Sequence, residues 1–137
     1  NFYDLSVELL KERDIWDRIL DIEKDTDKKE ILELLQGVLD PETHLVDAIA
    51  KIVESEEYDL IFLTGVGEVY PYIRSHCILN NLHLKVKNKP VVMFFPGEYN
   101  YSVENGASLV LFSKLLDDKY YRAFNINNYE VQARESL

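Results

Sequence analysis

The sequence predicts an α/β fold: a three-layer, Rossmann-like sandwich with a mostly parallel sheet and an N-terminal helical region, in one domain of residues 1–137. Two observations predict it. Apolar residues recur at helical spacing in the first half, and two short continuous apolar runs, Leu60–Leu63 and Val91–Phe95, follow. Such runs are typical of strands buried on both faces of a parallel sheet. A helical stretch from about Val69 to Leu82 separates them, which predicts a right-handed βαβ unit.

Helices are expected over most of the first 57 residues. The apolar stripes of three of them are Ile15, Trp16, Ile19 and Leu20, then Ile31, Leu34, Leu35 and Val38, then Val46, Ile49, Ala50 and Val53. Asp27 can cap the second of these helices. Asp40-Pro41-Glu42 is a start signal for the third, with a capping carboxylate and a proline at the first helical position. An earlier helix is expected from about Asp4, after residues that can end a strand.

The chain after the second apolar run is less regular. The polar, glycine-bearing stretch Asn100–Ala107 is expected to be a loop, and Leu109–Leu116 a short helix. Residues Tyr120–Ile126 alternate large apolar and polar side chains, which predicts a further strand. The polar end, Asn127–Leu137, is expected to be a tail or a last helix.

Charge is unevenly distributed along the chain, whose net charge is −10. Residues 1–59 hold 18 acidic and seven basic residues, a balance of −11, whereas residues 60–137 balance at +1. An acidic half disfavours direct nucleic-acid binding. The acids either coat exposed helix faces or form an acidic docking face for a basic partner.

Membrane and secreted classes are disfavoured by the same composition. No apolar run approaches the roughly 20 residues that a spanning helix needs, and no basic segment precedes an apolar one as in a signal peptide. Cys77 is the only cysteine, which fits a reducing compartment. The sequence therefore predicts a cytoplasmic protein, with its oligomeric state left open.

A glycine-bearing turn, Thr64-Gly65-Val66-Gly67, follows the first predicted strand and opens the predicted helix. Such a turn can present backbone N–H groups to an anion. The lysine and hydroxyl of a phosphate loop and the third glycine of a dinucleotide fingerprint are missing, and Glu68 would repel phosphate. The turn is therefore either a tight structural link, a partner-contact loop, or a cryptic anion site.

Reactive side chains form no complete set in the sequence. Arg74 and His76 lie two positions apart on a predicted helix and do not share a face, and Cys77 falls on an apolar stripe with no evident activating base. Asp117-Asp118 can hold a cation or form a turn, and Tyr120-Tyr121 can stack on bases or pack in a core. We therefore predict no catalytic residue, metal or cofactor. A weaker alternative is a hydrolase that uses Arg74, His76 and Asp118.

Several of these segments together resemble the central signature of the BrxB family across roughly residues 58–126. They are Leu63–Gly67, Tyr70-Pro71, Arg74-Ser75-His76, Leu79–Leu82, Pro90–Gly97 with Tyr99-Asn100, Leu111-Phe112, Leu115, Asp117-Asp118 and Tyr120–Phe124. The family residues carried over as partner or anion contacts are Thr64, Gly65, Gly67, Tyr70, Arg74, His76, Pro96, Gly97, Asp118, Tyr120, Tyr121 and Arg122.

The resemblance implies a component of a bacteriophage exclusion (BREX) system, a multi-protein anti-phage machine. Such systems combine a DNA methyltransferase, a large ATPase and a PglZ-type, alkaline-phosphatase-like protein. The resemblance implies a non-catalytic adaptor role with the PglZ-type protein as direct partner. The alternative is a nucleotide- or phosphate-binding regulatory domain that uses the Thr64–Gly67 turn.

Two departures from the family pattern lead to further expectations. A strand and a helix that family members usually carry before the segment matching Asn1–Leu5 are not found here, so an exposed sheet edge is expected. The loop from Tyr101 to Ala107 is longer than the family's compact turn, so its shared role is in doubt.

Overall fold

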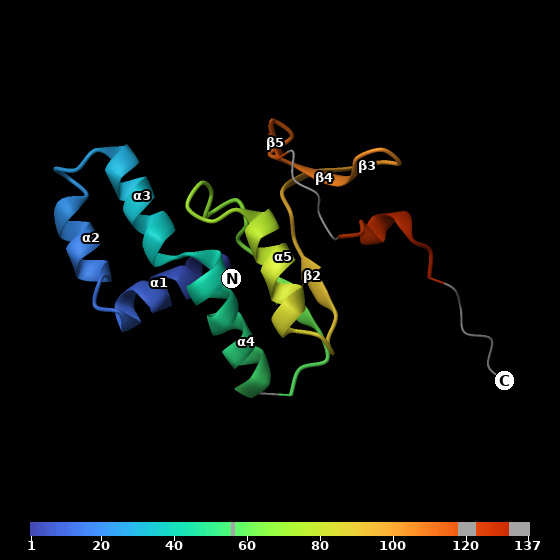
Figure 1. Ribbon diagram of the computed structural model, residues 1–137, viewed down its shortest axis with the longest axis horizontal. Helices are drawn as coiled ribbons and strands as arrows, with labels where there is room; N and C mark the ends of the chain where they lie inside the picture. Colours follow the sequence, from blue (N-terminus) through green and yellow to red (C-terminus); the bar gives the residue numbers. More distant parts are fainter. Residues whose placement is uncertain (56, 118–122, 132–137) are drawn as a thin grey trace.

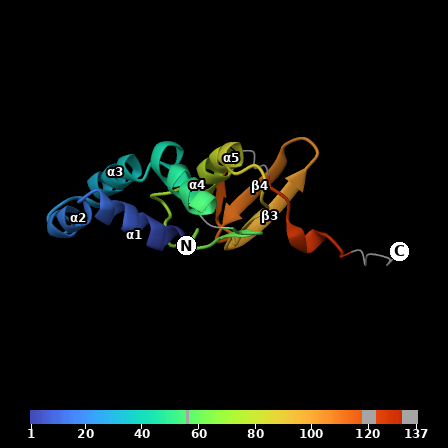
Figure 2. The same cartoon turned by 90° about the horizontal axis from the view of Figure 1, so that it is seen from below.

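The computed structural model describes residues 1–55, 57–117 and 123–131. Helices from the first part of the chain lie at one end of an elongated molecule, and a hairpin of strands lies toward the other end (Figures 1 and 2). Helix α5 lies between helix α4 and the strands in both views. The N-terminus lies in the middle of the molecule.

Four α-helices precede the first strand, and they confirm the expected helical region. They are α1 (Phe2–Glu12), α2 (Trp16–Ile22), α3 (Lys28–Val38) and α4 (Val46–Ser55), with a π-helical turn, Pro41–Leu45, leading into α4. Asp27 caps α3 by accepting a hydrogen bond from the Lys29 N–H at 3.2 Å. Asp40 accepts from the Glu42 N–H at the start of the π-helical turn. Asn1 is the cap of α1, so the first residues are not the end of a strand.

A βαβ unit follows, as the two apolar runs predict. Strand β1 (Ile61–Leu63) and strand β2 (Val91–Met93) pair in parallel, with Phe62 opposite Val92. Helix α5 connects them over Ser75–Lys85, so it begins six residues later than expected.

The three-layer, mostly parallel sandwich is wrong in two respects. The first is a separate antiparallel sheet in the order β3–β4–β5, formed by Gly97–Ser102, Gly106–Leu111 and Leu115–Asp117. The loop expected at Asn100–Ala107 is therefore mostly strand, and the helix expected at Leu109–Leu116 is strand and turn. Burial alternates along β4, with Ala107, Leu109 and Leu111 inside, a pattern that an α-helix cannot satisfy.

The second error concerns the layers. Ile61 and Leu63 are buried, but Phe62 between them is 57% exposed, and so is Phe94 just after β2. Among the described residues, helices therefore cover only one face of the β1–β2 sheet.

The remaining expectations fall near the C-terminus. The strand expected at Tyr120–Ile126 lies partly outside the described residues, and residues 123–125 have no regular structure. A short 3₁₀ turn, Ile126–Asn128, follows. Nothing among the described residues forms a helix long and apolar enough to cross a bilayer.

One hydrophobic core joins the helices to the βαβ unit. Its fully buried side chains include Phe2, Leu45, Val46, Ile78 and Leu82. A smaller cluster, Ala107 and Leu109, packs against Leu79, Met93 and Phe95. Because α5 contributes to both clusters, it connects the helical end to the antiparallel sheet.

An ion pair between Asp47 and Lys85 joins α4 to α5. The hydrogen bond from the Lys85 ammonium lowers the pKa of the Asp47 carboxyl below its usual value of 3.8, and the nearby charges of Lys85, Lys51 and His44 act in the same direction. A carboxyl whose folded pKa is lowered stabilises the protein above its unfolded pKa, and this contribution is lost as pH falls through the folded pKa.

We therefore expect Asp47→Asn to remove part of the acid sensitivity of folding. The variant should be less stable than the parent at pH 7, and the difference should shrink as pH falls below about 3.8. Denaturant titrations at pH 7, 5, 4 and 3 would measure it, with Asp21→Asn, an exposed carboxylate on α2, as the control. A constant difference across this range would contradict the prediction.

Candidate functional site

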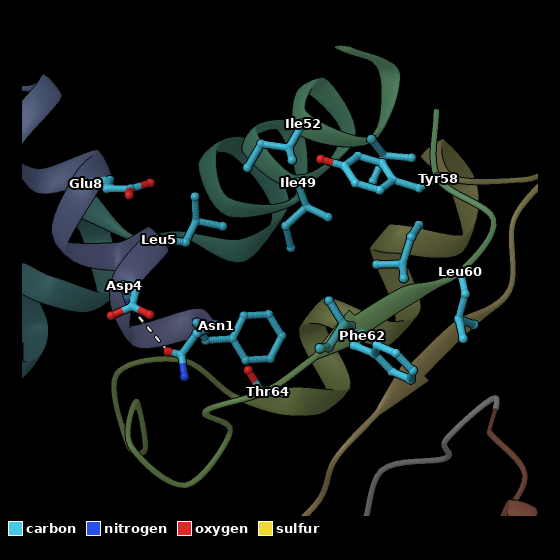
Figure 3. A pocket seen from close by; sticks show the side chains of 14 residues that line it. Asn1, Asp4, Leu5, Glu8, Ile49, Ile52, Tyr58, Leu60, Phe62 and Thr64 are labelled. Carbon is cyan, nitrogen blue, oxygen red and sulfur yellow. Dashed lines mark hydrogen bonds between the residues drawn. The ribbon is translucent and has the colours of Figure 1, made fainter. Parts of the chain in front are cut away.

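A groove of about 340 Å³ runs beside β1, and we call it the β1 groove. Leu5 of α1, Ile49 and Ile52 of α4, and Tyr58 line its apolar side, while Asp4 and Glu8 stand at its acidic rim. Figure 3 shows these side chains around the hollow between α1, α4 and β1. Leu60 and Phe62 lie on the side of β1 turned away from α4. The groove can accept an apolar segment, and its rim favours positive charge.

Backbone hydrogen bonds show that the groove follows an open strand edge. Ile61 donates to the Pro90 carbonyl at 3.0 Å, and the Leu63 carbonyl accepts from Phe94 at 2.9 Å, so both residues bond toward β2. Bonding directions alternate along a strand, so the N–H and C=O of Phe62 face the groove. Beyond them, the Thr64 carbonyl accepts the Phe2 N–H at 2.9 Å. In the described chain β1 pairs only with β2.

The Thr64–Gly67 turn does not open a helix, contrary to expectation, because α5 begins only at Ser75. Its glycines serve close packing. Gly65 has a φ of +81°, and a Cβ there would lie 2.7 Å from the Asn1 side chain. A Cβ on Gly67 would lie 2.9 Å from the Phe112 ring and 3.2 Å from Pro96. The turn thus holds the chain start and the β4–β5 connection against the end of β1.

A second hollow of about 300 Å³ lies beyond this turn, and we call it the Arg74–Lys114 pocket. The segments after β1 and β2 meet here with the start of α5 and the β4–β5 connection. Its apolar wall includes Val66, Phe95 and Leu109, and Tyr70 lines it as well. Of the family residues named from the sequence, the pocket brings together Tyr70 and Arg74. Lys114, which sequence reasoning missed, lies in the β4–β5 connection, between the signature residues Leu111-Phe112 and Leu115.

Both basic side chains of this pocket are exposed and lack an ionic partner in the described part of the chain. Arg74 is the N-cap of α5 and contributes no capping side-chain oxygen. Lys114 follows Phe112 and Ser113, whose φ values of +54° and +56° are left-handed. Residues other than glycine rarely adopt such values, at a cost of about 1–2 kcal/mol each. Two cations thus border one cavity, lined by both polar and apolar groups, in a protein of net charge −10.

The other residues named from the sequence lie elsewhere. The His76 Nε2 lies 3.1 Å from the Cys77 Sγ, a contact between neighbouring residues at the start of α5. Pro96 accepts the Phe112 N–H at 2.8 Å, and Gly97 begins β3. Asp118, Tyr120, Tyr121 and Arg122 lie outside the described residues. Of the hydrolase set of Arg74, His76 and Asp118, Arg74 borders the Arg74–Lys114 pocket, His76 does not line it, and Asp118 lies outside the described residues.

These features define a small protein of helices and two separate sheets: a helical region packed on a βαβ unit, an antiparallel sheet in the order β3–β4–β5, and a pocket beyond the carboxyl ends of the two parallel strands. The family model described as "BREX protein BrxB" matches residues 1–126. The chain therefore belongs to the BrxB family, which confirms the resemblance and extends it over the helical region.

Two curated relatives are similar over nearly the whole chain. A "BREX protein BrxB" of Bacillus cereus (strain H3081.97) is 40% identical over 127 residues, covering 92% of this chain and 64% of the relative. One of Escherichia coli O9:H4 (strain HS) is 29% identical over 126 residues, covering 92% and 60%. The chain thus spans under two thirds of the length of these relatives. No solved structure matches it.

Proposed function

We propose that this member of the BrxB family is a non-catalytic adaptor of a BREX phage-defence system and that it binds a PglZ-type protein in the cytoplasm. Family membership supports a role within BREX. The observation that carries the adaptor role is an aromatic surface on the uncovered side of the β1–β2 sheet. We call it the Phe62–Phe94 face.

The Phe62–Phe94 face consists of two aromatic rings and a neighbouring aliphatic side chain. The ring centroids of Phe62 and Phe94 lie 5.5 Å apart at an interplanar angle of 58°, and each residue is 57% exposed. Leu60, two residues before Phe62, is 39% exposed. Adjacent exposed aromatics are unfavourable in water and are enriched at protein interfaces. A partner that covers this face would remove apolar area from water without disturbing the core.

The acidic helices provide a second, electrostatic contribution. Glu30 and Glu33 lie exposed on α3, and Glu33 is 3.9 Å from the ammonium of Lys29. Exposed charges of this kind guide association and contribute less to affinity than buried apolar contacts. Asp47 is a poor docking residue because it already pairs with Lys85.

Co-purification with the PglZ-type protein tests the proposal. Phe62→Ala and Phe94→Ala should each weaken the complex by about tenfold or more, since buried aromatic anchors dominate interface energies. Leu84→Ala is the matched control, because Leu84 is 59% exposed on α5. The variants should melt at the temperature of the parent. Failure of the two full-length proteins to associate at micromolar concentration would remove the adaptor role.

Charge reversal on α3 separates the electrostatic contribution of the acidic helices from the apolar contribution of the Phe62–Phe94 face. Glu30→Lys with Glu33→Lys should slow association at low salt and change it little at high salt, because surface charges act over about 10 Å at 0.1 M salt. Association rates at two salt concentrations would show this. If the variant bound the partner equally poorly at both salt concentrations, α3 would contact the partner directly instead.

A further inference from the structure

We infer that the Arg74–Lys114 pocket binds a small phosphate ester of about mononucleotide size. This is a ligand site separate from the Phe62–Phe94 face, and the two can be tested independently. Three features carry it: two cations to which the described residues give no ionic partner, a cavity whose wall is partly apolar, and the match between the charge of the cations and that of phosphate.

The two cations come from elements that the fold brings together. Arg74 precedes α5, and Lys114 lies in the connection between β4 and β5, 40 positions along the chain. Like charges on one cavity repel each other, and 25 acidic residues in the chain could have neutralised them. The described residues nevertheless give neither one an ion pair. An anion supplied from outside would neutralise both charges.

The cavity also constrains the rest of the ligand. Its volume of about 300 Å³ lies at the lower end of the range typical of small-molecule sites. Val66, Phe95 and Leu109 provide apolar surface, and Tyr70 adds an aromatic ring. The ligand should therefore combine an anionic group with a planar or apolar body.

Charge balance favours phosphate over a carboxylate. A phosphate monoester carries between about −1.5 and −2 at pH 7, which matches the two cations, whereas one carboxylate neutralises only one of them. An arginine also binds phosphate oxygens with two parallel hydrogen bonds.

Calorimetric titration of the chain with adenosine monophosphate tests the site, with inorganic phosphate, adenosine and benzoate as comparison probes. We expect the nucleotide to bind with a Kd below about 1 mM and more tightly than the other three. Benzoate binding as tight as the nucleotide would exclude phosphate as the ligand class. A flat titration with the nucleotide at 50 mM salt would overturn the site.

Substitutions then assign the binding to the two cations. Arg74→Ala and Lys114→Ala should each weaken nucleotide binding by about tenfold, the loss expected for one charge-assisted contact, while Arg74→Lys should retain part of it. Lys87→Ala removes an exposed charge beyond the end of α5 and should change the Kd less than about twofold. Circular dichroism would confirm that each variant is folded. An equal loss in Lys87→Ala would mean that net charge, and not this pocket, attracts the nucleotide.

Discussion

The Gly97→Ala variant should lose about 3 kcal/mol of its free energy of unfolding, because the added methyl group has no space. A Cβ on Gly97 would lie 2.0 Å from the Val110 carbonyl oxygen and 2.9 Å from the Phe95 ring. The oxygen belongs to the backbone of β4, which pairs with β3 from Gly97 to Ser102. Relief therefore requires the β3–β4 pairing to open at the point where β3 begins.

Gly37→Ala is the matched control for this change. Gly37 lies in α3, and a Cβ there would have no heavy atom within 4 Å. Alanine favours a helix over glycine by about 0.5–1 kcal/mol, so this variant should be more stable than the parent. Chemical denaturation followed by circular dichroism would measure both. If Gly97→Ala unfolds at the same denaturant concentration as the parent, the tight approach of β3 to β4 is wrong.

Ile78→Ala should destabilise the protein by about 2–5 kcal/mol, the range found when a large buried aliphatic side chain is removed. Ile78 is 0% exposed and lies on α5. It belongs to the core that joins the helices to the βαβ unit. The lost methyl and methylene groups would leave a cavity in that core.

Leu84→Ala on the same helix separates core packing from helix propensity. Leu84 is 59% exposed, so its truncation should change stability by about 0.5 kcal/mol or less. Thermal melts of the two variants side by side would show the contrast. Similar losses in both would indicate that α5 is not packed as described.

Local patterns predicted the helices and the βαβ unit because their signals are periodic and continuous. The antiparallel sheet was missed although a hairpin signal was present. Asn105-Gly106 is a dipeptide favoured in hairpin turns, and Gly106 has a φ of +70°. Apolar residues alternate after it at Ala107, Leu109 and Leu111, whereas the length and apolar content of Leu109–Leu116 favoured a helix.

The prediction of helices on both faces of the parallel sheet was wrong for a different reason. A continuous apolar run predicts burial on both faces, yet sequence cannot show whether anything covers the second face. Phe62 and Phe94 are as apolar as their neighbours and still point outward. The Arg74–Lys114 pocket was also beyond prediction, because Lys114 joins Arg74 in its lining only through the tertiary fold, after the turn at Phe112 and Ser113. The family signature singled out Tyr70, and Arg74 stood out both in that signature and in the hydrolase alternative.

The open edge of β1 affects how the purified chain behaves. Unpaired backbone groups beside apolar side chains are a template on which other copies can add strands. At neutral pH the net charge of −10 keeps copies apart. As acid protonates the carboxylates, this repulsion fades while the edge stays the same, so the chain should precipitate in mildly acidic buffers before it unfolds.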